Sequence, residues 1–371
     1  MERIKKIVIN SYRGINSLEL RDLSLINIIT GDNNCGKTSV LEVLESFSQP
    51  DDIRMWNSLT RRDVLSSGRI GMSIYEGISD LFNINSDEKK IEYSLETESE
   101  VLKLEAIATE SIEEISGKRY ADLSKVYVMD ADREALEQQI KQVTKLLFEV
   151  TLNNKRVIRE KIYDVQRYTT MGIRPVRRNQ ELSQNIIYIS PTHHATGNFF
   201  LSEVLDRPEL YEEMLTVLKG YDANIISVNY DKDKENVLSE GVYKILSKSH
   251  RKALPLNVYG DGMKKAILLM SAVIKAKNGI LLLDEFETAI HTSAMDKTFK
   301  WILETCKKLN VQVFMTTHSK EAIDKVLKCS ENLKNDITVF TMYKDDEEIS
   351  VRRLDGPKAI EVQDEMGLEL R

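Results

Sequence analysis

The sequence predicts an α/β fold in which helices pack on a mostly parallel sheet, and three stretches carry this prediction. The apolar run Leu23–Ile29 leads into a glycine-containing loop and then into a helical pattern that opens at Thr38. Two later apolar runs, Ile280–Leu283 and Val311–Thr316, end in polar residues. Strands that are apolar throughout are typical of parallel sheets buried on both faces. Such sheets bind ligands at the carboxyl ends of their strands.

The composition fits a folded protein of one large domain with an insertion, or of two domains. The chain has 371 residues, 42% of them hydrophobic, and a net charge of −7. No apolar run approaches the roughly 20 residues of a membrane helix, and Met1–Asn10 is a charged amphipathic strand rather than a signal peptide. Three distant cysteines, Cys35, Cys306 and Cys329, favour a reduced cytoplasmic compartment. The acidic balance argues against a DNA-coating protein but leaves room for a local basic patch.

The N-terminal part of the sequence has the pattern of a small β layer. Residues 4–11 and 18–20 are expected strands, and together with 23–29 they form this layer. The helix that opens at Thr38 is expected to end near Gln49-Pro50. Residues 91–95 and 101–108 alternate polar and apolar side chains, as in a half-solvated antiparallel pair.

Residues 121–185 are interpreted as an inserted helical region. Apolar residues recur at spacings of four and three, a helical stripe made of Leu136, Ile140, Val143, Leu147 and Val150. Similar spacing continues after Asn153-Asn154, so a helical hairpin or one long helix would fit. The second half is basic: Lys155, Arg156, Arg159, Lys161, Arg167, Arg174, Arg177 and Arg178. These cations could contact DNA phosphates or an acidic partner, or could form a solvated face.

From residue 186 the chain returns to an α/β rhythm. Strands are expected at 186–190, 280–284 and 311–316, and a hairpin at 225–230 and 242–247. Helices are expected at 201–219, 263–277, 293–309 and 321–327, followed by two C-terminal strands.

The stretch Gly31–Thr38 carries the clearest motif, because it fits the nucleotide-binding pattern G-x-x-x-x-G-K-[ST] between a strand and a helix. The backbone N–H groups of such a loop and the positive end of the helix dipole bind phosphates. We expect Lys37 to neutralise the β- and γ-phosphates of ATP and the Thr38 hydroxyl to bind Mg²⁺. The other expected nucleotide-binding residues of the loop are Gly31, Asn33, Asn34, Cys35 and Gly36.

Two further strand ends complete the expected site. Asp284 is expected to hold Mg²⁺, directly or through water, and Glu285 to orient and deprotonate the attacking water. His318 is expected to hydrogen-bond the γ-phosphate and to report its presence to the following helix. The blander alternatives are an acidic pair that caps the next helix and a surface histidine. The pair His193-His194 lacks a third ligand, so a loop pair is favoured over a metal site.

The order of these motifs resembles that of ABC-type ATPase heads of the SMC and RecF class. Ser11-Tyr12-Arg13-Gly14-Ile15 and the stretch Asp284–His291 look most like the ATPase portion of OLD-family proteins. Standalone ATPase subunits of prokaryotic anti-phage systems have a similar layout, with a separate effector encoded alongside. The resemblance implies an ABC-ATPase head (a P-loop NTPase) with an N-terminal antiparallel β layer and an inserted helical region. The expected division is 1–120, an N-terminal lobe with the phosphate loop; 121–185, the insertion; and 186–371, a C-terminal lobe.

The resemblance also implies roles for individual residues. Lys37, Thr38, Asp284, Glu285 and His318 take the roles given above, and Ser39 helps to bind the α-phosphate. In such heads two protomers sandwich ATP, and the second contributes a serine-containing signature loop. The matching stretch is Gly260-Asp261-Gly262, in which glycine replaces the serine, so engagement in trans is expected to be weak or partner-dependent and hydrolysis slow or partner-stimulated. Gln49 and Gln184 are unsupported candidates for the usual Q-loop glutamine. His291 is expected to cap a helix or to touch the dimer partner.

Three functions are compatible with these features. The first is a sensor or regulatory ATPase that forms a homo-oligomer and controls a separate effector such as a nuclease. A separate effector is expected because the segment after Leu354 has too few residues for a nuclease module. The second is a RecF-like repair clamp that binds DNA through residues 155–178. The third, a transporter subunit, is disfavoured by the insertion and the missing Q-loop, and no membrane partner is expected.

Overall fold

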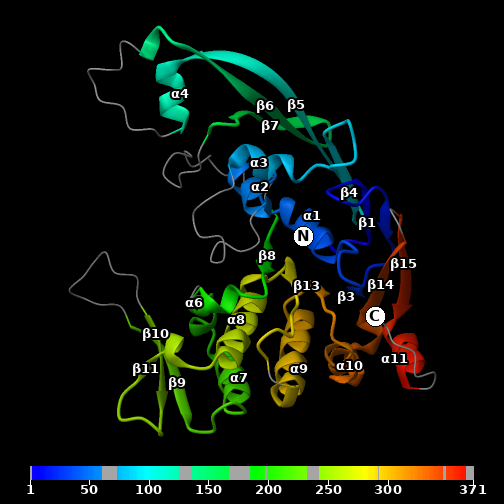
Figure 1. The fold of residues 1–371 in the computed structure, drawn as a ribbon. Coiled ribbons are helices and arrows are strands. Elements are labelled where there is room, and N and C mark those ends of the chain that lie inside the picture. Colours follow the sequence, from blue (N-terminus) through cyan, green and yellow to red (C-terminus); the bar gives the residue numbers. More distant parts are fainter. Residues whose placement is uncertain are drawn as a thin grey trace.

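A six-stranded, mostly parallel sheet forms the centre of the molecule (Figure 1). The computed structural model describes residues 2–60, 73–124, 136–166, 184–196, 199–231, 242–290, 292–345 and 348–364. The strand order is β15 (Glu348–Asp355), β14 (Ile337–Asp345), β3 (Ile26–Gly31), β13 (Gln312–Thr316), β12 (Ile280–Leu283) and β8 (Ile186–Ile189). Only β15 pairs antiparallel, so the other five strands present their carboxyl ends at one edge.

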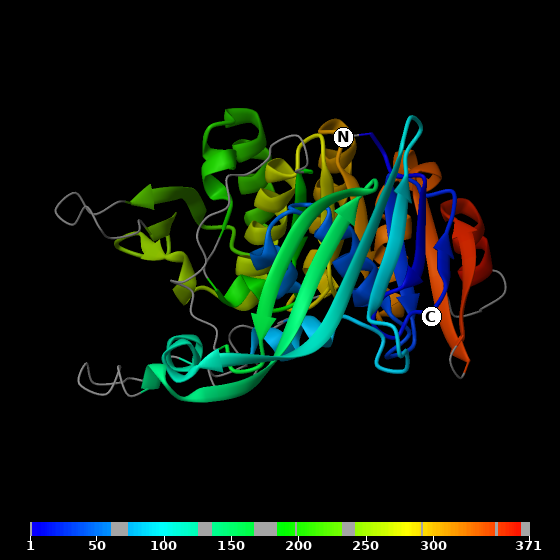
Figure 2. The ribbon, with the colours of Figure 1, turned by 90° about the horizontal axis from the view of Figure 1, so that it is seen from above.

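An antiparallel sheet covers one face of the central sheet. Its order is β2 (Leu18–Leu20), β1 (Lys6–Ser11), β4 (Lys90–Glu96), β5 (Val101–Ser116), β6 (Ile140–Leu152) and β7 (Lys155–Tyr163). Helix α1 (Lys37–Ser46) lies between the two sheets, and its apolar side chains share one core with both. Helices α2 (Ile53–Thr60) and α3 (Ile74–Ser79) close this layer. Strands β5 and β6 extend beyond the body and carry α4 (Gly117–Ser124) at their far end (Figures 1 and 2).

Helices cover the other face of the central sheet and enclose a second core with it. They are α6 (Leu201–Leu205), α7 (Pro208–Leu218), α8 (Asp261–Lys275), α9 (Thr292–Lys308), α10 (Lys320–Lys328) and α11 (Gly356–Asp364). A small sheet of β9 (Ile225–Asp231), β10 (Val242–Ser247) and β11 (Leu254–Pro255) packs beside α7. Short 3-10 helices occur at η2 (His193–Ala195), η3 (Leu256–Val258) and η4 (Glu331–Asp336). None of the described helices is both long and apolar enough to cross a membrane.

The predicted α/β class and the N-terminal antiparallel layer are confirmed, with two refinements. The run 23–29 joins the central sheet as β3 rather than the N-terminal layer, which consists of β1, β2 and β4–β7. The helix predicted over 201–219 is two helices, because Pro208 begins a new helix at its first position. The predicted hairpin at 225–247 and the helices α8, α9 and α10 form as expected.

The predicted helical insertion is wrong, because residues 140–163 form an antiparallel β-hairpin. Leu146, Phe148, Val150 and Leu152 alternate with half-buried residues and enter the core, whereas Ile140 of the presumed helical stripe is 70% exposed. Asn153 and Asn154 have φ angles of 49° and 64° and make the two-residue turn. Asparagine tolerates this left-handed conformation and therefore replaces the glycine expected in such turns. Of the basic set, Arg167, Arg174, Arg177 and Arg178 lie outside the described residues.

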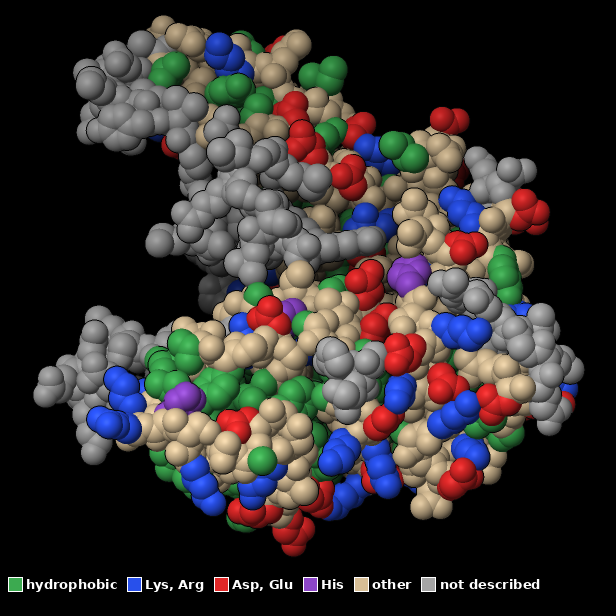
Figure 3. Space-filling model, turned by 60° about the horizontal axis from the view of Figure 1, so that its bottom comes forward, with side chains coloured by type: hydrophobic (Ala, Val, Ile, Leu, Met, Phe, Trp, Pro, Cys, Tyr) green, Lys and Arg blue, Asp and Glu red, His purple; other side chains and the backbone are tan. Residues whose placement is uncertain are grey.

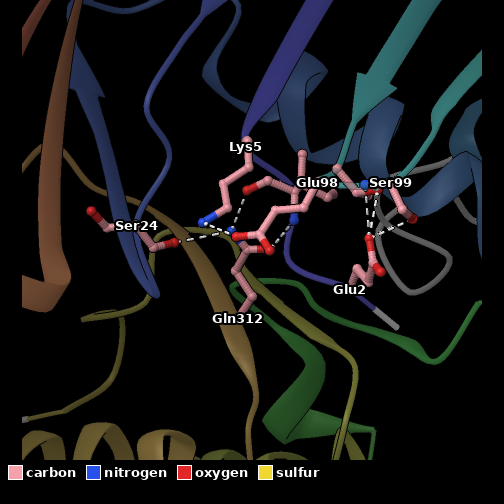
Figure 4. Close-up of polar contacts among 8 residues, drawn as sticks. Glu2, Lys5, Ser24, Glu98, Ser99 and Gln312 are labelled. Carbon is pink, nitrogen blue, oxygen red and sulfur yellow. Dashed lines mark hydrogen bonds and ion pairs between the residues drawn. The ribbon is translucent and has the colours of Figure 1, made fainter.

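A buried glutamine joins the N-terminal segment to the central sheet (Figure 4). The Gln312 side chain, 3% exposed, accepts a hydrogen bond from the Ile4 N–H at 2.8 Å. It also donates to the Ile4 carbonyl at 2.8 Å and to the Ser24 carbonyl at 3.0 Å. The neighbouring Lys5–Glu98 ion pair, 3.0 Å, is solvent-exposed. Buried backbone groups that lose their partners cost about 1–3 kcal/mol each, whereas an exposed ion pair contributes about 0–1 kcal/mol.

We therefore expect Gln312→Met to lower the free energy of unfolding by about 2–4 kcal/mol, since it leaves the Ile4 backbone groups unpaired inside the protein. Lys5→Met, which removes only the exposed ion pair, should change it by less than about 1 kcal/mol. Urea unfolding monitored by circular dichroism measures both. Equal effects of the two substitutions would contradict the role given to Gln312.

Candidate functional site

The phosphate loop adopts a backbone conformation that depends on its glycines. Gly31 ends β3 with a φ of 135°, and a Cβ there would lie 2.1 Å from the Met342 carbonyl oxygen of the neighbouring strand. Gly36 has a φ of 92° and precedes α1 without a side chain that could cap it. The first N–H groups of a helix lack intrahelical partners, so the start of α1 is suited to bind an anion. Asn34 also has a positive φ, 62°.

Lys37 is folded into this loop. It is 6% exposed, and its ammonium donates to the carbonyls of Gly31 at 3.0 Å and Asp32 at 2.6 Å. The same nitrogen lies 3.6 Å from the Sγ of Cys35, which is fully buried. The lysine charge is thus held beside the start of α1, where it adds to the positive potential of the helix terminus. This arrangement fits the triphosphate of a nucleotide.

Three hydroxyl groups converge on the carboxylate of Asp284, which follows β12 and is 6% exposed. Oδ1 accepts from the Oγ1 of Thr38 at 3.3 Å and of Thr316 at 2.5 Å. Oδ2 accepts from the Tyr188 hydroxyl at 3.1 Å. Thr38 and Asp284 are 246 residues apart in the sequence and meet because β3, β13 and β12 are adjacent. A hydroxyl and a carboxylate at this separation are hard oxygen donors of the type that binds Mg²⁺.

Glu285 and His318 flank this carboxylate. Glu285 is exposed, has a φ of 42°, and donates its N–H to Thr316 Oγ1 at 2.9 Å. Burial, and next the Lys37 ammonium, lower the pKa of His318, while Glu285 and a hydrogen bond with the Gly31 carbonyl act in the opposite direction. The imidazole is therefore neutral at pH 7 and lies beside the phosphate loop. The structure thus brings Lys37, Thr38, Asp284, Glu285 and His318 to one edge of the sheet.

The turn Ser11–Ile15 supports the phosphate loop from the antiparallel layer. A Cβ on Gly36 would lie 3.1 Å from the Ile15 side chain. Arg13 forms an ion pair with the buried Glu42 of α1 at 2.9 Å, and the Tyr12 hydroxyl donates to the same carboxylate at 3.2 Å. Ser39, in the first turn of α1, is 7% exposed. The motif before the phosphate loop therefore fixes α1.

The other expected residues are not part of this cluster. Gly260-Asp261-Gly262 begins α8, where Asp261 pairs with Lys264 at 2.6 Å and a Cβ on Gly262 would lie 3.0 Å from the Ala289 carbonyl. Gln184 precedes β8 and bonds to the Phe47 carbonyl, at the amino end of that strand, and Gln49 follows α1. The site of one protomer therefore contains neither glutamine.

The histidine pair lies in the single turn η2. The Nδ1 of His194 lies 3.1 Å from the Pro191 carbonyl oxygen. Within the ranges that the structure describes, no group of three or more His, Cys, Asp or Glu residues is arranged to hold a metal. His291 lies outside the described residues.

Sequence reasoning missed Tyr188 and Thr316, the residues that hold Asp284 and Glu285. Thr316 ends the apolar run Val311–Thr316 that precedes His318, and nothing in its sequence context distinguished it as a site residue. Tyr188 occupies the next-to-last position of β8, and its relevance depends on β8 pairing with β12. The sequence pattern does not predict that these two strands are neighbours.

The fold and the phosphate loop define a P-loop ATPase with the architecture of an ABC-type head. The solved structure titled "Crystal structure of the SmcHead bound to the C-winged helix domain of ScpA" is similar over 96% of this chain and 99% of that chain, with a TM-score of 0.52 and 12% identity. A Helicobacter pylori protein named "ATP/GTP phosphatase" is 21% identical over 95% of this chain and 96% of its own length. An uncharacterized protein of Methanocaldococcus jannaschii is 31% identical over 30% of this chain and 98% of its own length.

Residues 26–324 match the family described as "AAA domain, putative AbiEii toxin, Type IV TA system". The chain belongs to this family. It is an ATPase.

Glu45 lies one turn after Glu42 on α1, the helix that follows the phosphate loop, and its titration tests how this helix is packed. Burial, and then the nearby Glu42, raise the pKa of Glu45 from 4.5 to about 8. The folded state binds a proton that the unfolded state releases, so stability falls as the pH rises from 4.5 to about 8. We expect Glu45→Gln to melt a few degrees above wild type at pH 8.5 and within about 1 °C of it at pH 5.

The exposed Glu100→Gln serves as the control and should follow the wild-type curve. Melting temperatures at several pH values measure the effect. A Glu45→Gln curve parallel to that of wild type would contradict the raised pKa of Glu45.

Proposed function

We propose that this chain binds and hydrolyses Mg-ATP at the carboxyl edge of the central sheet and acts as the sensor subunit of a prokaryotic, defence-like complex. The observation that supports the site is the meeting of Thr38 and Asp284 beside the buried ammonium of Lys37. A hydroxyl, a carboxylate and an ammonium at the start of a helix are what a metal–triphosphate requires.

Each residue has a role that follows from its position. Lys37 and the N–H groups of residues 31–39 bind the phosphates, while Thr38 and Asp284 hold Mg²⁺, which neutralises phosphate charge when bound. Glu285, exposed at the strand end, orients water and accepts its proton. Neutral His318 has a single N–H, which bonds the Gly31 carbonyl in this structure and turns to the terminal phosphate when the nucleotide is bound. Asp284 is kept in place by Thr316 and Tyr188.

A regulatory role is supported by three features. The motif set resembles standalone OLD-like ATPase subunits, and the family description names a toxin of a type IV toxin–antitoxin system. The signature-like stretch has glycine in place of serine, which makes turnover dependent on a partner. ATP then drives two heads together, and a separate effector protein reads the closed or open state.

A RecF-like DNA clamp is the second candidate. The likeness to an SMC head favours it, as do the four cations of β7 at positions 155, 156, 159 and 161. Two of these, Arg156 and Arg159, pair with Glu149 at 3.0 and 3.3 Å. On the face shown in Figure 3, basic and acidic side chains are interspersed. The face shown in Figure 3 therefore presents no single basic surface for the clamp.

The deciding experiment is to express Glu285→Gln protein from its native locus with neighbouring genes intact and to determine its native mass with and without ATP. A second polypeptide in the complex supports the sensor role. A bare ATP-dependent homodimer whose DNA binding falls steeply with salt supports the clamp, because neutralised phosphates release counterions.

Glu285→Gln should bind ATP with wild-type affinity and hydrolyse it about 100-fold or more slowly, because the amide cannot accept a proton from water. Fluorescent-nucleotide titration and phosphate release measure the two quantities. The same assays with GTP establish whether the chain also accepts that nucleotide. Hydrolysis at the wild-type rate would exclude Glu285 as the base.

Gly260→Ser should strengthen ATP-dependent dimerisation about 10-fold or more, if the second head contributes a hydroxyl to the γ-phosphate. The site accepts serine, since Gly260 has φ −63° and ψ 152° and a Cβ there would meet no atom within 4 Å. Gly260→Ala is the matched control and lacks the hydroxyl. Analytical ultracentrifugation of both in the Glu285→Gln background makes the comparison, and identical behaviour would rule out the trans contact.

A further inference from the structure

Thr317, the residue before His318, is fully buried and hydrogen-bonded through both its backbone and its side chain. Its N–H donates to the Ile29 carbonyl of β3 at 3.2 Å. Its hydroxyl donates to the Glu287 carboxylate at 2.6 Å and accepts from the Ser319 N–H at 2.9 Å. A hydroxyl has one hydrogen to donate and lone pairs that accept, so both bonds form at the same time. One side chain thus connects the turn of His318 to the loop after β12.

The turn of His318 continues directly into α10. Ser319 is the N-cap of this helix, and its side chain accepts from the Ala322 N–H at 3.1 Å. The bond from the Ser319 N–H to the Thr317 hydroxyl therefore joins the start of the helix to the end of β13, with His318 between them. The histidine backbone is held on both sides, and its imidazole lies beside the Gly31 carbonyl.

Glu287 provides the acceptor from the loop after β12. Its Oε1 accepts the bond from the Thr317 hydroxyl, while Oε2 is buried and has no hydrogen-bond partner among the described residues. A buried carboxylate is unfavourable unless hydrogen-bond donors replace the lost water. The contact with Thr317 is therefore costly to break, and it ties Glu287 to the end of β13.

The same two segments are also joined one residue earlier. The Glu285 N–H donates to the Thr316 hydroxyl at 2.9 Å, and the Phe286 N–H donates to the Thr316 carbonyl at 3.3 Å. Glu285 has a φ of 42°, in the left-handed region that non-glycine residues adopt only when their surroundings hold them. Thr316 and Thr317 thus bind the loop of Glu285 at two successive points, and the second point is adjacent to His318.

We propose that Thr317 is a positioning residue whose hydroxyl, bonded to Glu287, fixes the turn of His318 against the loop of Glu285. The base and the phosphate-binding histidine then meet the nucleotide in one relative position, although they follow different strands. This inference rests on the proposed roles of Glu285 and His318. It assigns to Thr317 no contact with the nucleotide.

The test compares Thr317→Val, which keeps the shape of the side chain but lacks the hydroxyl, with Thr317→Ser, which keeps the hydroxyl. We expect Thr317→Val to lower kcat about 10-fold or more, since small displacements of a catalytic group have effects of this size or larger. KM and fluorescent-nucleotide affinity should stay within about 3-fold of wild type, as expected for a residue that acts on the chemical step. Thr317→Ser should recover most of the lost kcat.

Thr338→Val is the matched control for the loss of a buried hydroxyl. Thr338 is fully buried near the amino end of β14, and its hydroxyl shares a 2.7 Å hydrogen bond with that of Ser24. This variant should lose stability, as Thr317→Val does, but keep the wild-type kcat. An equal fall of kcat in the two valine variants, or no recovery in Thr317→Ser, would overturn the proposal.

Two comparisons test the contacts through which Thr317 acts. The double variant Thr317→Val/His318→Ala should be slower than His318→Ala by less than about 2-fold, whereas multiplied effects would contradict a role exerted through the histidine. Glu287→Gln keeps an oxygen for the Thr317 hydroxyl and should have a higher kcat than Glu287→Leu, which cannot accept the bond. If Thr317→Val does not fold, equal kcat values in the two Glu287 variants overturn the proposal, and a lower kcat in Glu287→Leu supports it.

His318→Ala and Glu285→Gln are assayed alongside these variants. If either turns over ATP at the wild-type rate, the role proposed for that residue is wrong. If both are slow while Thr317→Val is as fast as wild type, only the present inference fails.

Discussion

The adjacency of β3, β13, β12 and β8 in the central sheet is the constraint on which the site depends. It places the hydroxyls of Thr38, Thr316 and Tyr188 around one carboxylate, that of Asp284. Because these strands are parallel, their carboxyl ends meet at one edge, where the chain leaves the sheet and side chains are free to bind ligands. The two cores on either face of the sheet keep these strands in register.

Charges buried behind this edge connect the site to the rest of the molecule. On the side of the antiparallel layer, Arg13 and Tyr12 hold Glu42 and thereby α1. In the central sheet, Thr317, which follows β13, donates a hydrogen bond to Glu287 of the loop after β12. Buried ion pairs add little net stability but are costly to break, so they are suited to keep one conformation. Helix α1 and the loop after β12 are therefore each fixed by polar contacts from a different layer.

The projecting β5–β6 ribbon shows where pattern reasoning failed. Residues 136–150 satisfy a helical spacing and residues 146–152 satisfy a strand alternation, and local sequence does not decide between them. Pairing decides: β6 is hydrogen-bonded along its length to β5 and also to β7, so its backbone groups are satisfied in the sheet. The ribbon stands out from the body of the molecule with α4 at its far end (Figure 2).

The sequence by itself determined the elements whose signals are local. The phosphate loop is recognisable because its glycines are needed for φ angles that other residues avoid, and the run Ile280–Leu283 because a strand buried on both faces must be apolar. The sequence also indicated Lys37, Thr38, Asp284, Glu285 and His318, whose residue types suit their positions. Only the tertiary structure decided that Tyr188 and Thr316 hold Asp284, that Thr317 holds Glu287, and that residues 140–163 form a β-hairpin. Each of these depends on which segments lie side by side, and contacts between distant segments leave no periodic trace in the chain.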